Sequence, residues 1–268
     1  MISNNLFERI DNSKPLDFGG IFSKSIELFK KVWVQGFIHV IIPLAIMLAM
    51  FVIMYLVVFV GGFGIVGFTG IFAENMDVDF DEDLVVGIVA VIYMILFALL
   101  MLVVLIIPVS MTFAFTAHFF VVCRQSDMEM AEKTDYFMFL KGKYLRKTIT
   151  LSLILIGIIV LACLLCFFPV IYVMVPIQLM MVIYAFNPDM SVSDLVKASF
   201  NLGNRTWLIS FGLIFISIML VQVLGYVTCG LGSFFISSFT YIPIYYIYKD
   251  SLGFEDGEFE NDETPLLK

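Results

Sequence analysis

The sequence predicts an all-α integral membrane protein, and three observations lead to this fold class. Hydrophobic residues make up 61% of the 268-residue chain, charged residues make up only 14%, and the mean hydropathy is +1.03. A soluble domain carries about 25% charged residues, so this chain has too few to cover a surface in water. The charges are also segregated, and they leave four uncharged stretches of about 40 residues each, at 32–73, 84–123, 148–188 and 206–248.

Each uncharged stretch is long enough for two spanning helices, because one span needs about 20 apolar residues. The third and fourth stretches are interrupted by proline or glycine, at 167–169 and 228–232, and each is expected to form a hairpin. The first stretch predicts one span followed by a glycine-rich loop or re-entrant segment at 61–72. The second predicts one long helix bent at Pro108. The six expected spans are about 37–60, 84–122, 148–166, 169–186, 207–227 and 233–248; an eight-span model, with hairpins in the first two stretches as well, is the alternative.

Lysine and arginine set the expected orientation, since they accumulate in cytoplasmic segments. They precede the first span, lie between spans two and three and between spans four and five, and follow span six, whereas 74–83 contains none. Six spans with both termini in the cytoplasm satisfy this distribution. A single transmembrane domain is therefore expected over 1–249, followed by an acidic, disordered tail at 250–268.

Three amphipathic helices are expected at the cytoplasmic interface, at about 18–33, 127–143 and 192–203, and each leads into a span. The second and third begin with the capping-box patterns SDME at 126–129 and SVSD at 191–194. The third is expected to end at Gly203-Asn204. The fold is thus interpreted as a six-helix bundle built from three repeats of an interfacial helix and a helical hairpin.

The first and third repeats align without gaps. Ser25 matches Ser199 and Trp33 matches Trp207, and these are the only two tryptophans in the chain. Aromatic and basic side chains favour the membrane–water boundary. The returning helices of the three repeats each contain a proline, at Pro108, Pro176 and Pro243. The expected interfacial anchors are Trp33, Trp207, Lys30, Lys31 and Arg205.

Two segments resemble a known group of proteins. FSKSIELFKKVW at 22–33 and SVSDLVKASF at 191–200, followed by Trp207, are similar to segments of a broad group of six-span bacterial membrane proteins. The group includes YciC-like proteins and the membrane domain attached to some glycerophosphodiester phosphodiesterases. The resemblance implies a bacterial inner-membrane protein with no catalytic residues to carry over, because the phosphodiesterase catalytic domain has no counterpart here.

Few polar residues interrupt the expected spans. His39 and His118 are expected near the cytoplasmic ends of spans one and two, where interfacial packing is the main interpretation and a proton relay is the alternative. Gln178 and Gln222 are expected within the membrane, either in interhelical hydrogen bonds or lining a polar path with the histidines. The sequence predicts no catalytic, cofactor-binding or metal site.

Three acidic features bear on partners. The acidic run at 77–83 gives a weak calcium hypothesis, since it lacks the glycine and glutamate positions of an EF-hand loop. A net charge of −8 and a pI near 4.7 exclude a nucleic-acid partner, because phosphate backbones require a basic surface. The acidic tail is a candidate surface for a protein partner, and a homo-oligomer is also considered.

The composition and motifs together predict a non-enzymatic polytopic membrane protein that interacts with lipids, organises the envelope or assembles with a partner. Amphipathic helices beside spans respond to lipid composition, which favours this interpretation. The alternative is a transporter or flippase of a lipid or small amphiphile. Internal repeats and proline-bent helices favour transport, whereas the absence of carboxylate, lysine and arginine from the spans argues against it.

Overall fold

The computed structural model describes residues 2–75, 82–130, 135–165 and 168–254, and every regular element within these ranges is helical. Five of the helices are long and apolar enough to cross a membrane, which agrees with the predicted all-helical membrane class. In chain order the elements are α1 (Ile2–Asp11), α2 (Phe18–Asn75), α3 (Glu82–Asp127), η1 (Met138–Leu140), α4 (Gly142–Leu164), α5 (Phe168–Phe186), α6 (Val192–Val227), α7 (Leu231–Ile236), η2 (Ser237–Tyr241) and α8 (Ile242–Leu252).

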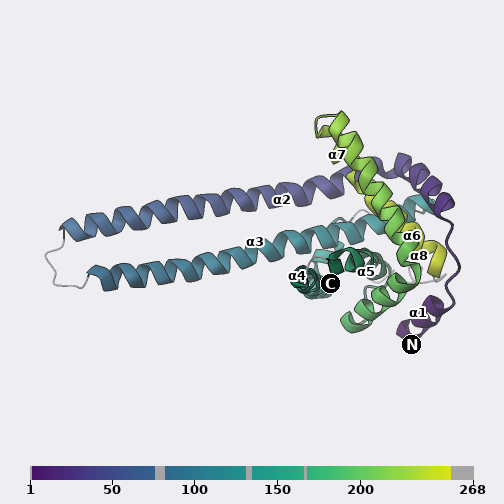
Figure 1. Ribbon diagram of the computed structural model, residues 1–268, viewed down its shortest axis with the longest axis horizontal. Helices are drawn as coiled ribbons and strands as arrows, with labels where there is room; N and C mark the ends of the chain where they lie inside the picture. The colour runs from purple at the N-terminus through teal and green to yellow at the C-terminus, as the bar shows by residue number, and fades with distance from the viewer. Residues whose placement is uncertain (1, 76–81, 131–134, 166–167, 255–268) are drawn as a thin grey trace, which may run out of the picture.

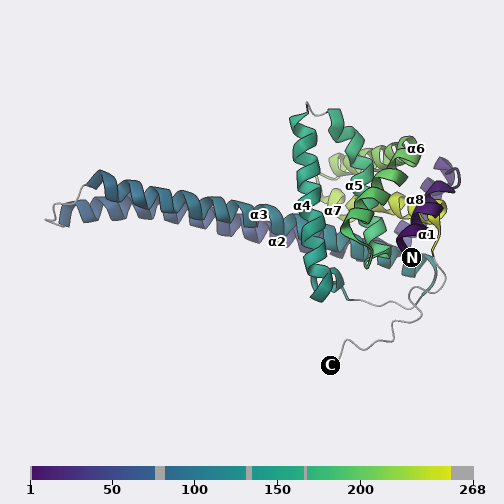
Figure 2. The same ribbon diagram turned by 90° about the horizontal axis from the view of Figure 1, so that it is seen from below.

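A long antiparallel pair formed by α2 and α3 dominates the shape. Both views show the pair projecting far beyond the other helices (Figures 1 and 2). We call the projecting part, residues 48–75 and 82–107, the arm, and the remaining helical structure the bundle. At 1.5 Å per residue, the 58 residues of α2 measure about 87 Å. The arm therefore departs from the compact six-helix bundle expected from the sequence.

The predicted loop or re-entrant segment at 61–72 is wrong, because α2 continues as a helix to Asn75. Glycines weaken a helix in water, but in an apolar medium the backbone must satisfy its own hydrogen bonds, and a helix does so. The uninterrupted helices α2 and α3 likewise do not contain the hairpins of the eight-span alternative. Pro43 and Pro108 lie inside these helices without ending them.

The first and third predicted interfacial helices are parts of longer helices. Residues 18–33 are continuous with the span in α2, and residues 192–203 are continuous with the span in α6. The predicted cap at Ser191 is confirmed, since its side chain accepts a hydrogen bond from the Asp194 backbone. The predicted stop at Gly203-Asn204 is wrong, because nothing there prevents α6 from continuing into its apolar half.

The second predicted interfacial helix, 127–143, does not form as such. Ser126 and Asp127 end α3 instead of capping a new helix, and Glu129 has a positive φ of 54°. The described part of this segment consists of turns and the short η1 helix before α4 begins at Gly142. The prediction that residues 126–129 begin a helix is therefore wrong. The apolar run before them belongs to α3, which continues to Asp127.

The expected sixth span, 233–248, is not one regular helix but a chain of α7, η2 and α8. Gly230 adopts a φ of 89° before α7. The hydroxyls of Ser233, Ser237 and Thr240 each bond to a carbonyl three residues back, which competes with regular α-helical pairing. Pro243 lies in the first turn of α8, where its missing N–H costs nothing. These elements return alongside α6 (Figure 1).

The core of the bundle is formed by the inner part of α3 together with α5, α6 and α8. Its largest fully buried side chains include Phe113, Phe120, Tyr184 and Tyr245. The helix α4 runs across the direction of the arm (Figure 2). The arm and α4 consequently cannot both lie parallel to the same membrane normal.

The acidic segment and the tail are only partly described. Residues 77–81 of the calcium hypothesis and 255–268 of the tail lie outside the described residues. The predicted tail nevertheless starts too early, since Asp250 belongs to α8 and Phe254 packs against Phe186 and Tyr245. These residues are held by the aromatic core of the bundle.

Candidate functional site

The two histidines of the chain form a buried pair where the arm meets the bundle. His39 on α2 and His118 on α3 are 79 residues apart in sequence, yet His39 Nε2 and His118 Nδ1 are 2.6 Å apart. Their rings stack with centroids 5.0 Å apart. Only 5% of His39 and 2% of His118 is exposed. The antiparallel pairing of α2 and α3 brings them together, and no motif in the sequence signals it.

The hydrogen bonds assign the tautomers of both rings. His39 Nδ1 lies 2.6 Å from the Gln35 carbonyl oxygen, which can only accept, so Nδ1 carries a proton. A neutral His39 then has a lone pair on Nε2, and His118 Nδ1 must donate to it. The remaining nitrogen, His118 Nε2, then keeps its lone pair and is the position of the histidine pair that can accept a proton. The pair can therefore take up one proton at His118 without losing a hydrogen bond, whereas a second proton must break the contact between the rings.

The loop before α4 covers the pair. The Tyr136 ring lies 5.3 Å from His39 and 5.4 Å from His118, measured between centroids, and its hydroxyl donates to Gln35 Oε1 at 2.7 Å. Next to it, hydrogen bonds from the Lys141 ammonium hold the pKa of Asp135 below its usual value. The negative charge of Asp135 also interacts electrostatically with the His118 ring. The loop thus combines an aromatic cover with an acidic side chain beside the pair.

A cavity of about 200 Å³ adjoins His39 between α2, α3 and η2. Pro43 lines it and lacks an N–H, so the helix offers no donor to the carbonyl of His39 four residues earlier. The walls are mostly apolar, with a few hydroxyl groups. The lining residues are His39, Val40, Pro43, Leu44, Met47, Thr112, Thr116, Phe119, Ser238 and Tyr241.

Ser238 lies in this wall with an unsatisfied hydroxyl group. Only 1% of the residue is exposed, and its Oγ has no hydrogen-bond partner among the described residues. A buried polar group without a partner costs about 1–3 kcal/mol. Close packing holds Ser238 in place: a Cβ added at Gly36 would lie 2.1 Å from Ser238 Oγ. Glycine at position 36 therefore allows η2 to approach α2 at the cavity.

The four residues expected to line a polar path do not come together. Gln178 on α5 is partly buried, and its Oε1 has no partner among the described residues. Gln222 on α6 is exposed on the surface of the bundle. Neither lines the cavity beside His39. The structure pairs the histidines and leaves both glutamines apart from them.

The expected interfacial anchors differ in their surroundings. Trp33, Lys30 and Lys31 are exposed on α2. Trp207 stacks on Phe211 and donates to the Tyr172 carbonyl. Arg205 is exposed and forms an ion pair with Asp11 at 3.4 Å.

The apolar face of the first amphipathic segment packs on protein. Its Ile21 and Ser25 are fully buried, and the Phe22 and Phe29 rings each form a T-shaped contact with the Phe239 ring on η2. This face is therefore covered by the bundle, although the sequence alone suggested that it lies against lipid.

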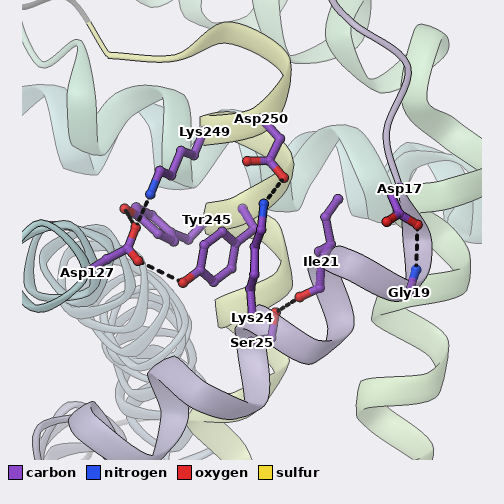
Figure 3. A network of polar contacts seen from close by, with 10 residues as sticks. Asp17, Gly19, Ile21, Lys24, Ser25, Asp127, Tyr245, Lys249 and Asp250 are labelled. Carbon is purple, nitrogen blue, oxygen red and sulfur yellow. Dashed lines mark hydrogen bonds and ion pairs between the residues drawn. The ribbon is translucent and has the colours of Figure 1, made fainter.

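A second polar cluster joins α8 to the end of α3 and to the start of α2 (Figure 3). Asp127 accepts hydrogen bonds from the hydroxyls of Tyr245 at 2.7 Å and Tyr246 at 2.9 Å, and it forms an ion pair with Lys249. Nearby, Lys24 pairs with Asp250 at 3.1 Å. These contacts hold α8 against the start of α2 and the end of α3. Their evident effect is structural, because each charged group in them is satisfied by a neighbour.

Among the described residues, no three His, Cys, Asp or Glu side chains are grouped so that they could hold a metal ion. The fold and the site thus define an all-helical membrane protein with a buried histidine pair beside a small cavity. Comparisons of the chain with protein-family models, with curated proteins and with solved structures found no match.

Proposed function

We propose that this chain is a non-enzymatic integral membrane protein that acts through lipid contact, with the bundle holding the arm in the membrane. One observation carries the proposal: apart from Glu74, Glu82 and Asp83 at its far end, the arm carries no charged residue on any side. In α2, nine of the ten residues from 51 to 60 are exposed, and all ten are uncharged. A helix that is apolar all round requires an apolar medium. The role proposed is lipid interaction, envelope organisation or assembly with a partner, which includes a second copy or a protein that meets the acidic tail.

We further propose a bacterial inner-membrane location with both termini in the cytoplasm. The distribution of lysine and arginine supports this orientation, and the resemblance of 22–33 and 191–200 to YciC-like proteins supports the location. If both termini lie on the same side, the chain must cross the membrane an even number of times. The five long helices therefore require a sixth crossing. The segment α7–η2–α8 is proposed for this role, since it returns along α6.

The arm is longer than a membrane is thick, and this determines how it can be embedded. The uncharged part of α2, residues 32–73, measures about 63 Å as a helix, whereas the hydrocarbon core is about 30 Å thick. A straight arm immersed in lipid must therefore be strongly tilted. We propose that lipid surrounds the tilted arm along most of its length.

Fluorescence quenching tests the lipid environment of the arm. In a cysteine-free background, a fluorophore is attached at Phe59→Cys on the arm or at Glu27→Cys, an exposed position on the same helix within the bundle. After reconstitution into vesicles, brominated lipids should quench the label at 59, and aqueous iodide should quench the label at 27. If iodide quenches the label at 59 as strongly as the label at 27, the arm lies in water and the proposal fails.

The transporter or flippase is the second candidate, and the histidine pair beside a cavity is the observation that favours it. Ionisable groups within a membrane commonly mark a transport path. Proteoliposomes with a fluorescent lipid analogue distinguish the two candidates. Transport predicts translocation of the analogue that depends on His118, whereas the leading proposal predicts the rate of protein-free vesicles.

A further inference from the structure

One face of α2 carries a lysine, a tryptophan and a phenylalanine in the direction of the arm. Lys30, Trp33 and Phe37 follow one another at spacings of three and four residues, so they lie on the same side of the helix. Lys30 is exposed, as is 44% of Trp33. Phe37 stacks on Phe235 of α7, with ring centroids 4.8 Å apart, and 46% of Phe235 is exposed. Along the helix, this face changes from a cation through an amphipathic ring to an apolar aromatic surface.

The polar groups of this face have no partner in the described ranges of the chain. Neither the Lys30 ammonium nor the Trp33 indole forms a hydrogen bond, an ion pair or a ring contact there. An ammonium and an indole N–H can only donate. A ligand of this face must therefore supply acceptor oxygens, and a negative charge opposite Lys30.

The equivalent face of the third repeat is closed by protein and shows which groups it takes. In the alignment of the repeats, Trp207 stands at the position of Trp33, and Asn204 stands at the position of Lys30. The Trp207 indole donates to the Tyr172 carbonyl oxygen at 3.2 Å, and Asn204 accepts from the Tyr172 hydroxyl. In the first repeat the amide is replaced by a cation. The corresponding ligand there has a carbonyl oxygen for the indole and an anion for the lysine.

The neighbouring charges favour a ligand with a net negative charge. Lys31 is adjacent to Lys30, and Glu27 lies one turn before it; both are exposed. The facing elements α7 and η2 contain no charged residue. The two lysines outnumber the one glutamate, so one positive charge remains on this surface. A monoanionic ligand would neutralise that charge, whereas a zwitterionic one would not.

We propose that Lys30 and Trp33 bind an anionic glycerophospholipid of the cytoplasmic leaflet. Its phosphate lies against the Lys30 ammonium, one of its ester carbonyls accepts from the Trp33 indole, and an acyl chain follows Phe37 and Phe235. Residues three apart on a helix have Cβ atoms about 5–6 Å apart, and in the lipid only the glycerol backbone separates phosphate from ester. This site rests on the lipid contact proposed above and names its headgroup chemistry.

Tryptophan quenching by brominated lipids tests the site on the full chain in vesicles. Trp207→Phe leaves Trp33 as the only tryptophan. The vesicles contain phosphatidylcholine and phosphatidylglycerol, and each lipid in turn carries bromine on its acyl chains. We expect phosphatidylglycerol to bind beside Trp33 about fivefold more tightly, which corresponds to about 1 kcal/mol for one lysine near an anionic surface.

A matched pair of lysine variants separates the site from general attraction to anionic lipid. Lys30→Gln should abolish the fivefold preference. Lys197→Gln should retain it, because Lys197 is an exposed lysine of the corresponding amphipathic segment in α6. Equal quenching by the two brominated lipids in the parent protein, or equal losses in the two variants, overturns the proposal.

Two further ligands test the ester carbonyl and the source of the phosphate. Diether phosphatidylglycerol, which lacks ester carbonyls, should bind beside Trp33 about fivefold more weakly than the diester lipid, as expected for one lost hydrogen bond. Equal binding of the two forms overturns the proposal. Displacement of brominated phosphatidylglycerol by glycerol phosphate also overturns it, because the site would then take a soluble phosphate.

The label at position 59 distinguishes a failure of this site from a failure of the proposed function. If brominated lipids quench that label but Trp33 shows no preference, the arm lies in lipid and only the headgroup site is wrong. If the label at 59 is quenched by iodide instead, the proposed function itself fails.

Discussion

At the scale of single residues, the histidine pair is the feature with the most defined chemistry. Each ring is fixed by a partner whose role is not interchangeable: the Gln35 carbonyl can only accept, and His39 Nε2 must therefore accept from His118. The sequence contains only these two histidines, and it predicted interfacial packing for each of them separately. Their pairing depends on the register of α2 against α3, which periodicity within either helix does not determine.

Replacing the histidines singly and together tests the pair. His118→Phe leaves His39 Nε2 buried without a donor, and His39→Phe leaves His118 Nδ1–H without an acceptor. Each single change should lower the free energy of unfolding by about 1–3 kcal/mol. The double change removes both polar groups, so it should cost less than the sum of the two single changes. Unfolding of the purified protein in mixed micelles by increasing SDS measures all four free energies.

The double-mutant cycle also has an outcome that contradicts the pair. Residues that do not touch give additive effects within about 0.5 kcal/mol. Additive losses for His39→Phe and His118→Phe would therefore show that the rings do not share a hydrogen bond. In that case the earlier interpretation, two independent packing histidines, would be the correct one.

At the scale of helices, the irregular η2 is one of the elements, with α7 and α8, that pack against α2. Phe239 packs in T-shaped contacts with two rings from α2, and Ser238 lies directly over Gly36. A regular helix through 233–248 was predicted because the segment is uncharged and apolar. Local hydroxyl–carbonyl hydrogen bonds, which hydropathy does not register, produce the 3₁₀ turn.

Gly36→Ala should weaken this contact. The added Cβ would lie 2.1 Å from Ser238 Oγ, 2.6 Å from Ser238 Cβ and 3.2 Å from the Phe119 ring, so η2 must move. Overpacking of this kind costs about 1–3 kcal/mol of unfolding free energy. The same SDS titration measures the loss.

Gly64→Ala provides the control on the same helix. Nothing lies within 4 Å of a Cβ added at Gly64, and alanine favours a helix over glycine by up to about 1 kcal/mol. This variant should be as stable as the wild type or slightly more stable. If Gly36→Ala behaves like Gly64→Ala, then η2 does not pack on α2 in the membrane-embedded protein.

At the scale of the whole molecule, the sequence correctly predicted the class but not the arrangement. Segregated charge and uncharged stretches were sufficient to predict an all-helical membrane protein with long apolar helices. They did not distinguish a glycine-rich loop at 61–72 from a continuing helix, since both are apolar. They also carried no information on the directions of the helix axes relative to one another, so nothing in the sequence predicted an arm that runs across α4 (Figure 2).

The division into bundle and arm predicts that the arm can be shortened without loss of the bundle. Residues 49–66 and 88–105 face each other across the arm, as the contact of Tyr93 with Gly61 indicates. Each segment is 18 residues long, or five turns at 3.6 residues per turn, so its deletion keeps the helix faces in register. The cavity and the histidine pair remain, because both lie closer to the bundle. The uncharged part of α2 would fall from about 63 Å to about 36 Å, close to the thickness of the hydrocarbon core.

The shortened protein should insert into vesicles, and its bundle should unfold within about 0.5 kcal/mol of the full-length protein, as expected when only exposed positions are removed. In a Trp33→Phe background, the fluorescence of Trp207, which is stacked on Phe211 within the bundle, follows this transition during SDS titration. A smaller deletion within the bundle, residues 169–186, serves as the comparison and should prevent folding, because α5 contributes much of the core. If shortening the arm destabilises the bundle by several kcal/mol, then the outer part of α2 and α3 packs against the bundle, and the projecting arm is not the arrangement that the protein adopts in lipid.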